Sequence, residues 1–355
     1  MPENTALFIG AFALWDCESQ QGGDMGVNMT LEEMAKELGV SKSTVSRALS
    51  GKGRIGNETR KKIMDYAKRQ ECRIEYEKVT RLPTKNLGVI LPADVYLNGG
   101  PYFQECILGI CETATLMDYD VLITSGTAND VSGIRALVEK EKVDGIILTR
   151  SLNDDRAVQY LTKVGFPVGL TGICDEDIIQ VDTDNEGAAE RLTTILIGSG
   201  YRKFALIVDT MDYRVNRSRH SGFSRALLKN GLTPENQFIY AGMLNPELLD
   251  SLIGDVLSKK VECIICGDDI ICTKIMSSLQ SQGYRIPRDV AVASLYNSHN
   301  LDCFTPSVTA VNVSARQVGN MIARQMIGFL LGKDYRKKTI MDFEILLRKS
   351  TNGIV

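Results

Sequence analysis

The 355-residue sequence contains only two histidines and one tryptophan. His220 and His299 are not spaced as metal ligands with each other or with any cysteine, so we expect neither a metal nor a cofactor. The nine cysteines follow no regular spacing and no secretory signal precedes them, which predicts reduced thiols in a cytoplasmic protein rather than a disulfide framework. The apolar run from Ala6 to Trp15 is too short to span a bilayer, so no membrane association is expected.

One pair of cysteines does have the spacing of a chelating or redox motif. Cys263 and Cys266 lie in the apolar run VECIIC, which is typical of a buried strand. Residues three apart on a strand point to opposite faces, so this pair is poorly placed to hold a metal. We therefore interpret both cysteines as small hydrophobic core residues.

Basic residues are absent from the first 28 positions, and acidic residues are absent from Gly39 to Ile55. The first absence, together with the lack of any clear pattern, predicts that residues 1–28 are a disordered extension of a protein that functionally begins near Met25 or Met29. The second absence coincides with a surplus of positive charge, since residues 29–86 carry a net charge of +6 while the whole chain carries −3. A small basic module on an acidic body is the layout expected when one module contacts phosphate.

Within that module, residues 30–51 have the pattern of two short helices joined by a tight turn. The first helix has an apolar stripe at helical spacing, Gly39 can end it with a positive φ, and Ser41 is suited to cap a second helix at 42–50. The second helix should direct Val45 and Leu49 inward and a set of polar and basic side chains outward. This is the helix-turn-helix arrangement that fits the major groove of DNA, although a simple helical hairpin with a solvated polar face shows the same spacing. A third helix at about 57–70 completes a bundle over 29–72, and the polar stretch 73–86 has the composition of a linker.

From residue 87 the pattern changes to apolar strands that alternate with helices. Strands are predicted near 87–92, 119–125, 143–149, 166–172 and 178–181, and the alternation restarts after Asp184 with strands near 203–209, 237–241, 262–267 and 290–296. Alternation with short loops predicts doubly wound parallel sheets, and two such blocks predict two similar α/β lobes over 87–355. Ligands of such sheets bind beyond the carboxyl ends of the strands, here in the cleft between lobes.

The motifs of the chain resemble those of the lactose-repressor/galactose-repressor (LacI/GalR) family of bacterial transcription regulators. The resemblance covers 29–355 and rests on Gly39-Val-Ser-x-x-Thr-Val-Ser-Arg-Ala-Leu49 with Thr59-Arg60, Arg219-x-x-Gly-Phe223, Cys266-Gly-Asp-Asp269, Gly283-Tyr-Arg-Ile-Pro-x-Asp-Val290, Pro306-x-Val-Thr-x-Val311 and Arg348-x-Ser-Thr351. It implies a homodimer that binds a pseudo-palindromic operator, and a core of periplasmic-binding-protein type whose small effector alters operator affinity.

The resemblance assigns roles to individual residues of the helix-turn-helix. Lys42, Ser43 and Arg47 fall where the family reads base edges, although Lys42 is equally suited to a phosphate contact. Arg47 can also be argued from chemistry, because a guanidinium can donate two hydrogen bonds to the O6 and N7 edge of guanine. Positions where the family contacts phosphate or supports the helix are matched by Ser41, Thr44, Ser46 and Ser50, and Thr59 and Arg60 open the third helix.

For the effector, the resemblance points to Arg219, Asp268 and Asn297. An arginine fork suits hydroxyls or a carboxylate, and an aspartate at a strand end can accept hydrogen bonds from a polyol, but a surface ion pair or a helix cap would use the same residue types. Tyr102 and Phe103 match an aromatic pair of the family that lines the cleft, or they belong to the core. A sugar-like effector is therefore expected.

Two departures from the family pattern limit what is implied. The linker lacks the family's Pro-Asn and Ala-Arg-x-Leu motif, so the resemblance does not carry insertion of a leucine into the minor groove over to this chain. No C-terminal heptads follow Thr351, which favours a dimer over a tetramer. The alternatives are a solute-binding protein without a regulatory role and an α/β enzyme; for the enzyme we find no nucleophile–base pair, phosphate-binding glycine loop or metal set.

Overall fold

The computed structural model describes residues 31–50, 55–69, 83–93, 100–127, 130–233, 237–242 and 246–352. The chain separates into two compact units, with the boundary between Pro83 and Thr84. Each unit is described by itself. The predicted extension at 1–28 lies outside the described residues, and so does most of the predicted linker at 73–86. Both assignments remain predictions.

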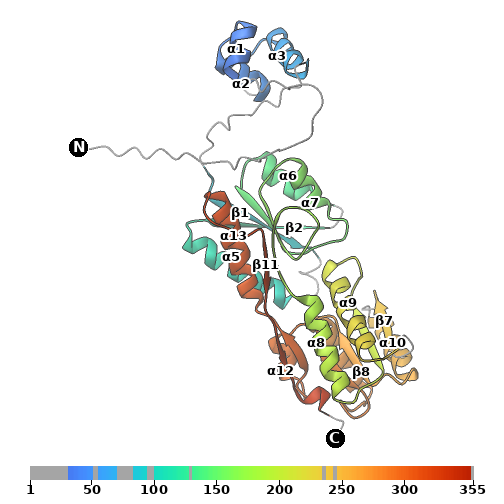
Figure 1. The fold of residues 1–355 in the computed structure, drawn as a ribbon. Coiled ribbons are helices and arrows are strands. Elements are labelled where there is room, and N and C mark those ends of the chain that lie inside the picture. Colours follow the sequence, from blue (N-terminus) through green and yellow to red (C-terminus); the bar gives the residue numbers. More distant parts are fainter. Residues whose placement is uncertain are drawn as a thin grey trace, which may run out of the picture. The chain divides into compact units, whose positions relative to one another are not determined.

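In the described part of the first unit, three short helices surround one small core (Figure 1). They are α1 (Leu31–Leu38), α2 (Lys42–Ser50) and α3 (Asn57–Arg69), close to the predicted spans. Met34 from α1, Val45 from α2 and Ile63 from α3 are each at most 1% exposed and form the centre of this core. The bundle therefore depends on one large apolar side chain from each helix.

The turn between α1 and α2 has the predicted glycine conformation. Gly39 adopts a φ of +67°, which side chains with a Cβ rarely take, and the amide of Val40 donates to the carbonyl of Ala35 at 3.0 Å. This six-to-one hydrogen bond is the mark of a Schellman helix end. Val40 is half-buried against the same core as Ala35, so the turn is held by both a hydrogen bond and an apolar contact.

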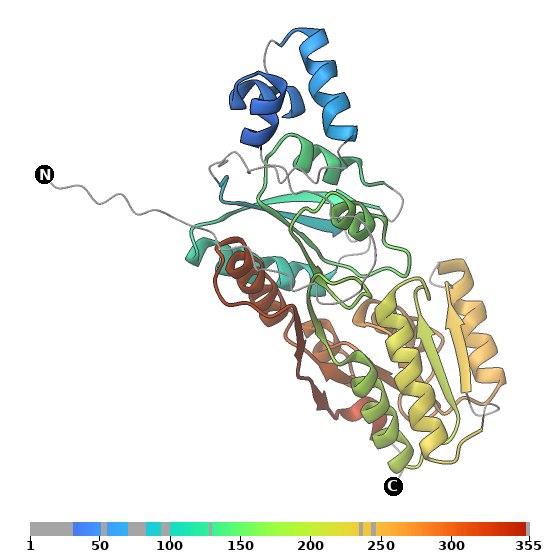
Figure 2. The same cartoon turned by 45° about the horizontal axis from the view of Figure 1, so that its top comes forward.

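The second unit consists of two lobes, each built on a six-stranded sheet (Figures 1 and 2). The first lobe has the strand order β11-β5-β4-β3-β1-β2 and is entirely parallel. Its strands are β1 (Asn86–Pro92), β2 (Asp120–Gly126), β3 (Gly145–Leu148), β4 (Val168–Thr171), β5 (Ile179–Thr183) and β11 (Lys338–Met341). Its helices are α5 (Pro101–Leu116), α6 (Ser132–Glu139), α7 (Arg156–Lys163) and α13 (Ala315–Leu330).

The second lobe repeats this arrangement with the order β12-β10-β9-β8-β6-β7, in which only β12 is antiparallel to its neighbour. Its strands are β6 (Phe204–Val208), β7 (Gln237–Ala241), β8 (Cys263–Cys266), β9 (Ala291–Ser294), β10 (Thr309–Asn312) and β12 (Glu344–Leu346). Its helices are α8 (Asn185–Gly198), α9 (Arg214–Lys229), α10 (Pro246–Ser258), α11 (Asp269–Ser281) and the short α12 (His299–Cys303), and a 3₁₀ turn follows at Lys349–Thr351. The equivalent strand orders agree with the prediction of two similar lobes.

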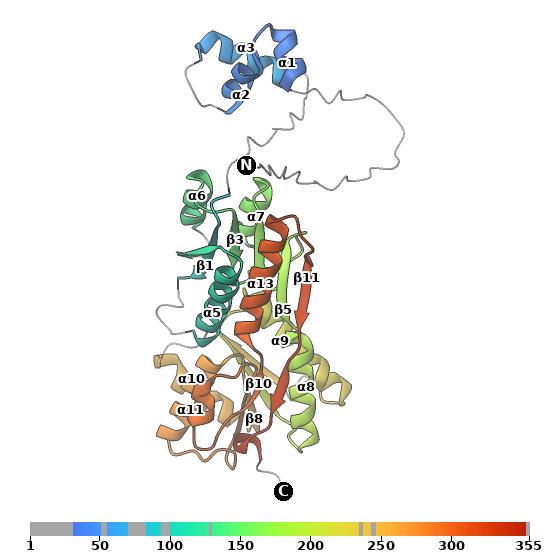
Figure 3. The ribbon, with the colours of Figure 1, turned by 90° about the vertical axis from the view of Figure 1, so that its left-hand side faces the viewer.

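The expectation of two successive blocks is incomplete, because the chain returns to the first lobe near its C-terminal end. After β10 the chain crosses back to form α13, which packs along α5 (Figure 3), and β11, which pairs with β5. It then crosses again to β12 in the second lobe. Three segments therefore connect the lobes, at residues 183–185, 312–315 and 341–344.

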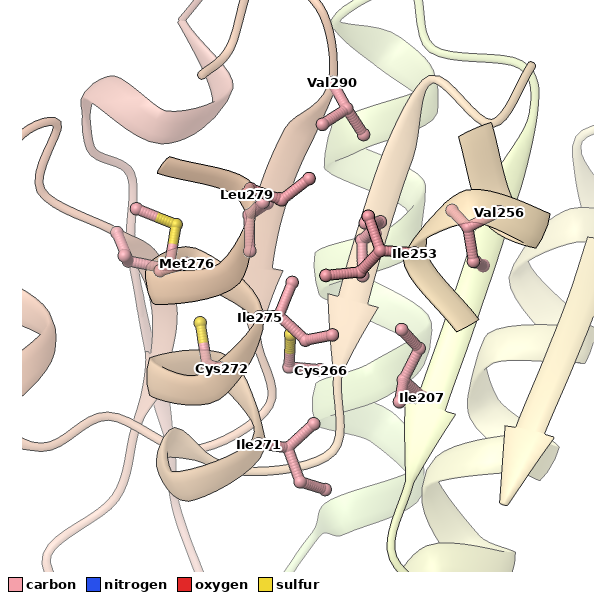
Figure 4. Close-up of a cluster of buried hydrophobic side chains, with 14 of the residues drawn as sticks. Ile207, Ile253, Val256, Cys266, Ile271, Cys272, Ile275, Met276, Leu279 and Val290 are labelled. Carbon is pink, nitrogen blue, oxygen red and sulfur yellow. The ribbon is translucent and has the colours of Figure 1, made fainter. Parts of the chain in front are cut away.

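Each sheet is covered on both faces by apolar side chains. In the second lobe the cluster of Figure 4 joins residues of β8, α10 and α11, among them Ile253, Ile275 and Leu279, which are fully buried. Along β8, Cys263 belongs to the cluster on one face of the sheet and Cys266 to the cluster on the other. Burial raises the pKa of both thiols, and the interpretation of this pair as core residues is consistent with these positions.

Candidate functional site

The N-terminal end of α2 is organised by the hydroxyl of Ser41. This oxygen accepts a hydrogen bond from the amide of Thr44 at 3.1 Å, and it lies 2.8 Å from the hydroxyl oxygens of Ser43 and Thr44. Ser41 is therefore the N-cap of α2, as expected from the sequence. A cap of this kind fixes the first turn of the helix, where Lys42 and Ser43 also lie.

The exposed face of α2 carries most of the side chains predicted to contact DNA. Lys42, Ser43 and Arg47 are exposed, while Thr44 and Ser46 are half-buried. Ser43 and Arg47 are four residues apart and so share one face of the helix, with Val45 buried on the opposite side. The structure thus presents a ridge of hydroxyl and basic groups without an acidic group on this helix.

The remaining predicted DNA contacts lie at the edges of this ridge. Ser50 is the last residue of α2, and its side chain lies outside the described part. Thr59 and Arg60 are half-buried in the first turn of α3, where the amide of Arg60 donates to the carbonyl of Gly56 at 3.0 Å. The roles of the nine residues in DNA contact remain predictions.

A cavity of about 390 Å³ lies between the two lobes of the second unit. Its wall is built mainly at the carboxyl ends of the parallel strands, as expected for sheets of this kind. Four of the five predicted effector residues line it: Tyr102, Phe103, Arg219 and Asp268. The residues that the sequence argument missed include Arg150, Asp182, Asp209, Tyr213, Asn216, Asp269, Lys274 and Tyr296.

Arg219 projects from α9 and is the most buried cation of this wall, with 9% of its surface exposed. One of its terminal nitrogens donates to the side-chain oxygen of Asn216 at 3.3 Å, and its Nε has no hydrogen-bond partner. Burial lowers the pKa of this guanidinium, and the nearby carboxylates of Asp268 and Asp182 act in the opposite direction. A buried donor without a partner is costly, so Arg219 is prepared to donate to a ligand in the cavity.

Asp182, at the carboxyl end of β5, faces Arg219 across the cavity wall. Its Oδ1 accepts from the amide of Thr183 at 2.8 Å and from Nδ2 of Asn185 at 3.0 Å. Burial raises the pKa of this carboxyl from 3.8 to about 6 in spite of these donors and of Arg219. The group is therefore held in an environment that disfavours its charge.

Asp268 has two roles, because it both lines the cavity and caps a helix. Its Oδ1 accepts from the amide of Ile271 at 2.8 Å, which makes it the N-cap of α11. The sequence left open whether Asp268 caps a helix or contacts a ligand; the structure shows the cap, and the ligand contact remains a prediction. The adjacent Asp269 is 3% exposed, and burial raises the pKa of its carboxyl.

Aromatic rings form one side of the cavity. Tyr102 packs edge to face with Phe103 at 5.4 Å and with Tyr296 at 5.5 Å between ring centroids, so rings from α5 and from the end of β9 meet across the lobes. Burial raises the pKa of Tyr102 and of Tyr296, which keeps both phenols neutral. Such a wall offers apolar faces for a ring-shaped ligand beside hydroxyl groups that can donate or accept.

Asn297, the fifth predicted effector residue, does not line this cavity. Its Nδ2 donates to Asn312 at 3.2 Å, and its Oδ1 accepts from Arg348 at 2.9 Å. Arg348 also donates to the carbonyl of Val308 at 2.6 Å. Asn297 therefore joins β10 to the C-terminal segment, and the neighbouring Tyr296 is the residue that reaches the ligand space.

Arg150 is the most informative of the residues that were missed. Its guanidinium lies 4.3 Å from the ring centroid of Tyr213 and 5.2 Å from that of Phe103, and it donates to the Tyr213 hydroxyl at 3.0 Å. Arg150 follows β3, Asp182 is the last but one residue of β5, and Tyr296 follows β9. A search for polar or aromatic residues at the carboxyl end of every predicted strand would have found all three.

The lobes are also joined by backbone hydrogen bonds next to Arg150. Leu152 of the first lobe forms a β-bridge with Tyr213 of the second. The amide of Asn153 donates to the carbonyl of Asp212 at 3.1 Å, and the amide of Arg214 donates to the carbonyl of Ser151 at 3.2 Å. This contact between residues 151–153 and 212–214 closes one side of the cavity.

Within the described ranges, no group of three or more His, Cys, Asp or Glu side chains is arranged to hold a metal ion. The same part of the chain contains no helix that is long and apolar enough to cross a membrane.

Comparison with known proteins gives two family matches. Residues 30–70 match the family described as bacterial regulatory proteins of the lacI family, and residues 193–351 match the periplasmic binding protein-like domain. Together these models cover the helix-turn-helix bundle and much of the two-lobed unit.

Two curated proteins align with most of the chain. The HTH-type transcriptional regulator RegA of Clostridium saccharobutylicum is 24% identical over 336 residues, covering 91% of this chain and 99% of that protein. Catabolite control protein A of Priestia megaterium is 26% identical, with 88% of this chain and 95% of that protein covered.

Solved structures agree on the fold. A probable maltose operon repressor, MalR, from Staphylococcus aureus matches with a TM-score of 0.72 at 24% identity, over 77% of this chain and 99% of that one. The complex of the transcriptional regulator CelR with cellobiose matches with a TM-score of 0.69 at 23% identity. The match covers 91% of this chain and 99% of that one. The chain therefore combines a helix-turn-helix segment that matches the lacI family with a two-lobed body that matches the periplasmic binding protein-like domain, and it is similar along most of its length to transcription regulators.

Proposed function

We propose that the protein is a transcription repressor that binds a pseudo-palindromic operator as a homodimer and is switched by a small, uncharged polyhydroxylated effector, such as a sugar. The observation that carries this proposal is the pairing of an exposed hydroxyl and basic face on α2 with a polar cavity between two lobes. A solute-binding protein needs the cavity but has no use for the face on α2, so this alternative is not favoured.

The charges of the cavity wall support an uncharged ligand. Three cations (Arg150, Arg219 and Lys274) and four carboxylates (Asp182, Asp209, Asp268 and Asp269) line it. A phosphorylated or acidic ligand would bring its charge close to these carboxylates, which is unfavourable in a partly buried site. Hydroxyl groups of a sugar can donate to the same carboxylates and accept from Arg219, and the apolar face of a sugar ring can lie on Tyr102 or Tyr296.

The family relationship supports the same class of ligand, since the solved CelR complex contains cellobiose. On this proposal the ligand contacts both lobes, because Tyr102 and Asp182 belong to the first and Arg219 and Asp268 to the second. A ligand that contacts both lobes favours one relative position of them, and the dimer transmits that preference to the two α2 helices.

The proposal is tested in two steps. Operator selection from a random DNA library, followed by fluorescence anisotropy, should give a site with two-fold symmetry that binds two chains per duplex. Thermal-shift screening of neutral sugars should then identify a compound that stabilises the protein and changes operator affinity. Failure to select any symmetric sequence would contradict the DNA-binding role. A phosphorylated compound that stabilises the protein more than its neutral counterpart would contradict the uncharged effector.

A further inference from the structure

A second cavity of about 240 Å³ adjoins the first; its wall belongs to the first lobe except for Tyr213 of the second. It lies beyond the carboxyl ends of β1, β2 and β3 and is walled chiefly by aliphatic groups. These include Ile90, Leu91, Pro92, Ile134, Leu148 and Leu152. No function proposed so far uses this space, which we call the annex.

The annex and the effector cavity share three wall residues: Thr149, Arg150 and Tyr213. The stacked pair of Arg150 and Tyr213, held at 4.3 Å and by the 3.0 Å hydrogen bond, therefore stands between the two spaces. Both are long side chains, so a change of rotamer would open a passage while leaving the backbone in place.

The few polar groups of the annex wall are already engaged. The hydroxyl of Thr149 donates to the carbonyl of Ile90 at 2.7 Å. Asp155 caps α7 by accepting from the amides of Ala157 at 3.0 Å and Val158 at 3.1 Å. A sugar ring placed in the annex would find few partners for its hydroxyls, which makes a second polar ring costly there.

An apolar group fits this wall better than a polar one. Apolar protein cavities of about 150 Å³ hold benzene, and the annex is larger than that. A change of rotamer of Arg150 and Tyr213 would join the annex to the effector cavity, so that one molecule could occupy both, with its polar part beside Arg219 and its apolar part beside Leu152.

We propose that the annex binds the apolar aglycone of the effector, so that the preferred ligand class is an aryl or alkyl glycoside rather than a free sugar. This inference rests on the proposed function for the polar half of the ligand. The aglycone half is an independent claim about the aliphatic wall. Arg150 and Tyr213 then lie at the junction between sugar and aglycone.

The first experiment compares methyl and phenyl glycosides of glucose, galactose and xylose, in both anomeric forms, by calorimetric titration of the full chain. For the glycone that binds, the phenyl glycoside should bind about tenfold more tightly than the methyl glycoside, because its ring leaves water for the annex. Ala157→Phe, which adds a ring to the annex wall, should abolish this advantage and change the methyl glycoside affinity less than about twofold. Gln159→Phe places the same ring at an exposed position of the same helix and should keep the advantage.

A second experiment detects the annex without any sugar. The fluorine NMR signal of 4-fluorobenzyl alcohol should broaden with the unaltered protein and with Gln159→Phe, and should stay sharp with Ala157→Phe. Circular dichroism and melting temperature verify that all three proteins are folded.

The outcomes separate the two proposals. Equal affinity of phenyl and methyl glycosides, tighter binding of a disaccharide such as cellobiose than of any phenyl glycoside, or an unchanged fluorine signal with Ala157→Phe would each overturn the annex proposal. If no glycoside binds or alters operator affinity, the sugar-like effector is refuted, and the fluorine experiment still decides whether the annex takes an apolar ring.

Discussion

Replacing Asp182 by asparagine is expected to stabilise the two-lobed unit at neutral pH, and to stabilise it less in acid. Burial raises the pKa of this carboxyl from 3.8 in an unfolded chain to about 6 in the folded protein. Well below pH 3.8 the carboxyl of Asp182 is protonated in both the folded and the unfolded state, so no charge is buried on folding. As the pH rises from about 4 to about 6, the unfolded state ionises first, so stability is lost across this range and then stays constant.

The size of the effect follows from the shift. One pKa unit corresponds to about 1.4 kcal/mol, so the charge costs about 3 kcal/mol at pH 7.5 and about 1 kcal/mol at pH 4.5. These are upper values, because Asp182 is partly open to the water of the cavity. Asparagine keeps an oxygen that can accept from the amide of Thr183 and from Asn185, so the hydrogen bonds need not be lost.

Melting temperatures measured by calorimetry at the two pH values test this reasoning. At about 2–4 °C per kcal/mol, the variant should melt up to about 10 °C higher at pH 7.5 and up to about 4 °C higher at pH 4.5. Asp334→Asn, at an exposed position, is the control and should change neither value. A gain at pH 4.5 equal to or larger than that at pH 7.5 would refute the assignment of the cost to the buried charge.

Three further predictions concern DNA binding and packing. Arg47→Ala should weaken binding to the selected operator by about 1–3 kcal/mol while binding to random DNA changes less, as measured by anisotropy at fixed salt; equal discrimination by the variant would remove Arg47 from base reading. Ser41→Ala should destabilise the helical bundle by about 1 kcal/mol and weaken operator binding. Ser41→Asn can still cap α2, so it should retain most of the stability and most of the operator affinity. If the two variants melt at the same temperature, the Ser41 hydroxyl is not acting as a cap. Gly222→Ala should destabilise the second lobe by about 1–3 kcal/mol or more, because the new Cβ would lie 2.0 Å from the carbonyl oxygen of Glu186 on α8. Gly198→Ala is the control, since Gly198 has open space around it, and it should be close to neutral. An unchanged stability of the Gly222→Ala protein would show that α8 and α9 can separate freely.

Much of the fold was predictable because buried parallel strands leave a strong local signal. The run LGVILP forms β1 with its five central residues buried, and the restart after Asp184 falls at the first crossing between lobes. The return of the C-terminal region was not predicted. β11 and β12 are short and only half-buried, and a strand of three or four residues does not specify which sheet it will join.

The candidate site divides in a similar way. Arg219 and Asp268 were found because they belong to recognisable motifs, and both line the cavity. Arg150 and Asp182 were missed because no motif contains them, although each lies at the end of a strand. Asn297 does not line the cavity, whereas its neighbour Tyr296 does, because the side-chain amide of Asn297 is hydrogen-bonded to Asn312 and Arg348 instead.

The return of the chain to the first lobe has a consequence for biosynthesis. The sheet of that lobe lacks its outermost strand β11, and its core lacks α13, until residues 315–341 have left the ribosome. The described core of the bundle formed by α1, α2 and α3 draws on residues from Met34 to Tyr66, so we expect it to fold early in translation. Nascent chains would then acquire α2 well before they acquire a closed effector cavity. The capacity to bind DNA and the capacity to bind an effector would therefore arise at different times during synthesis.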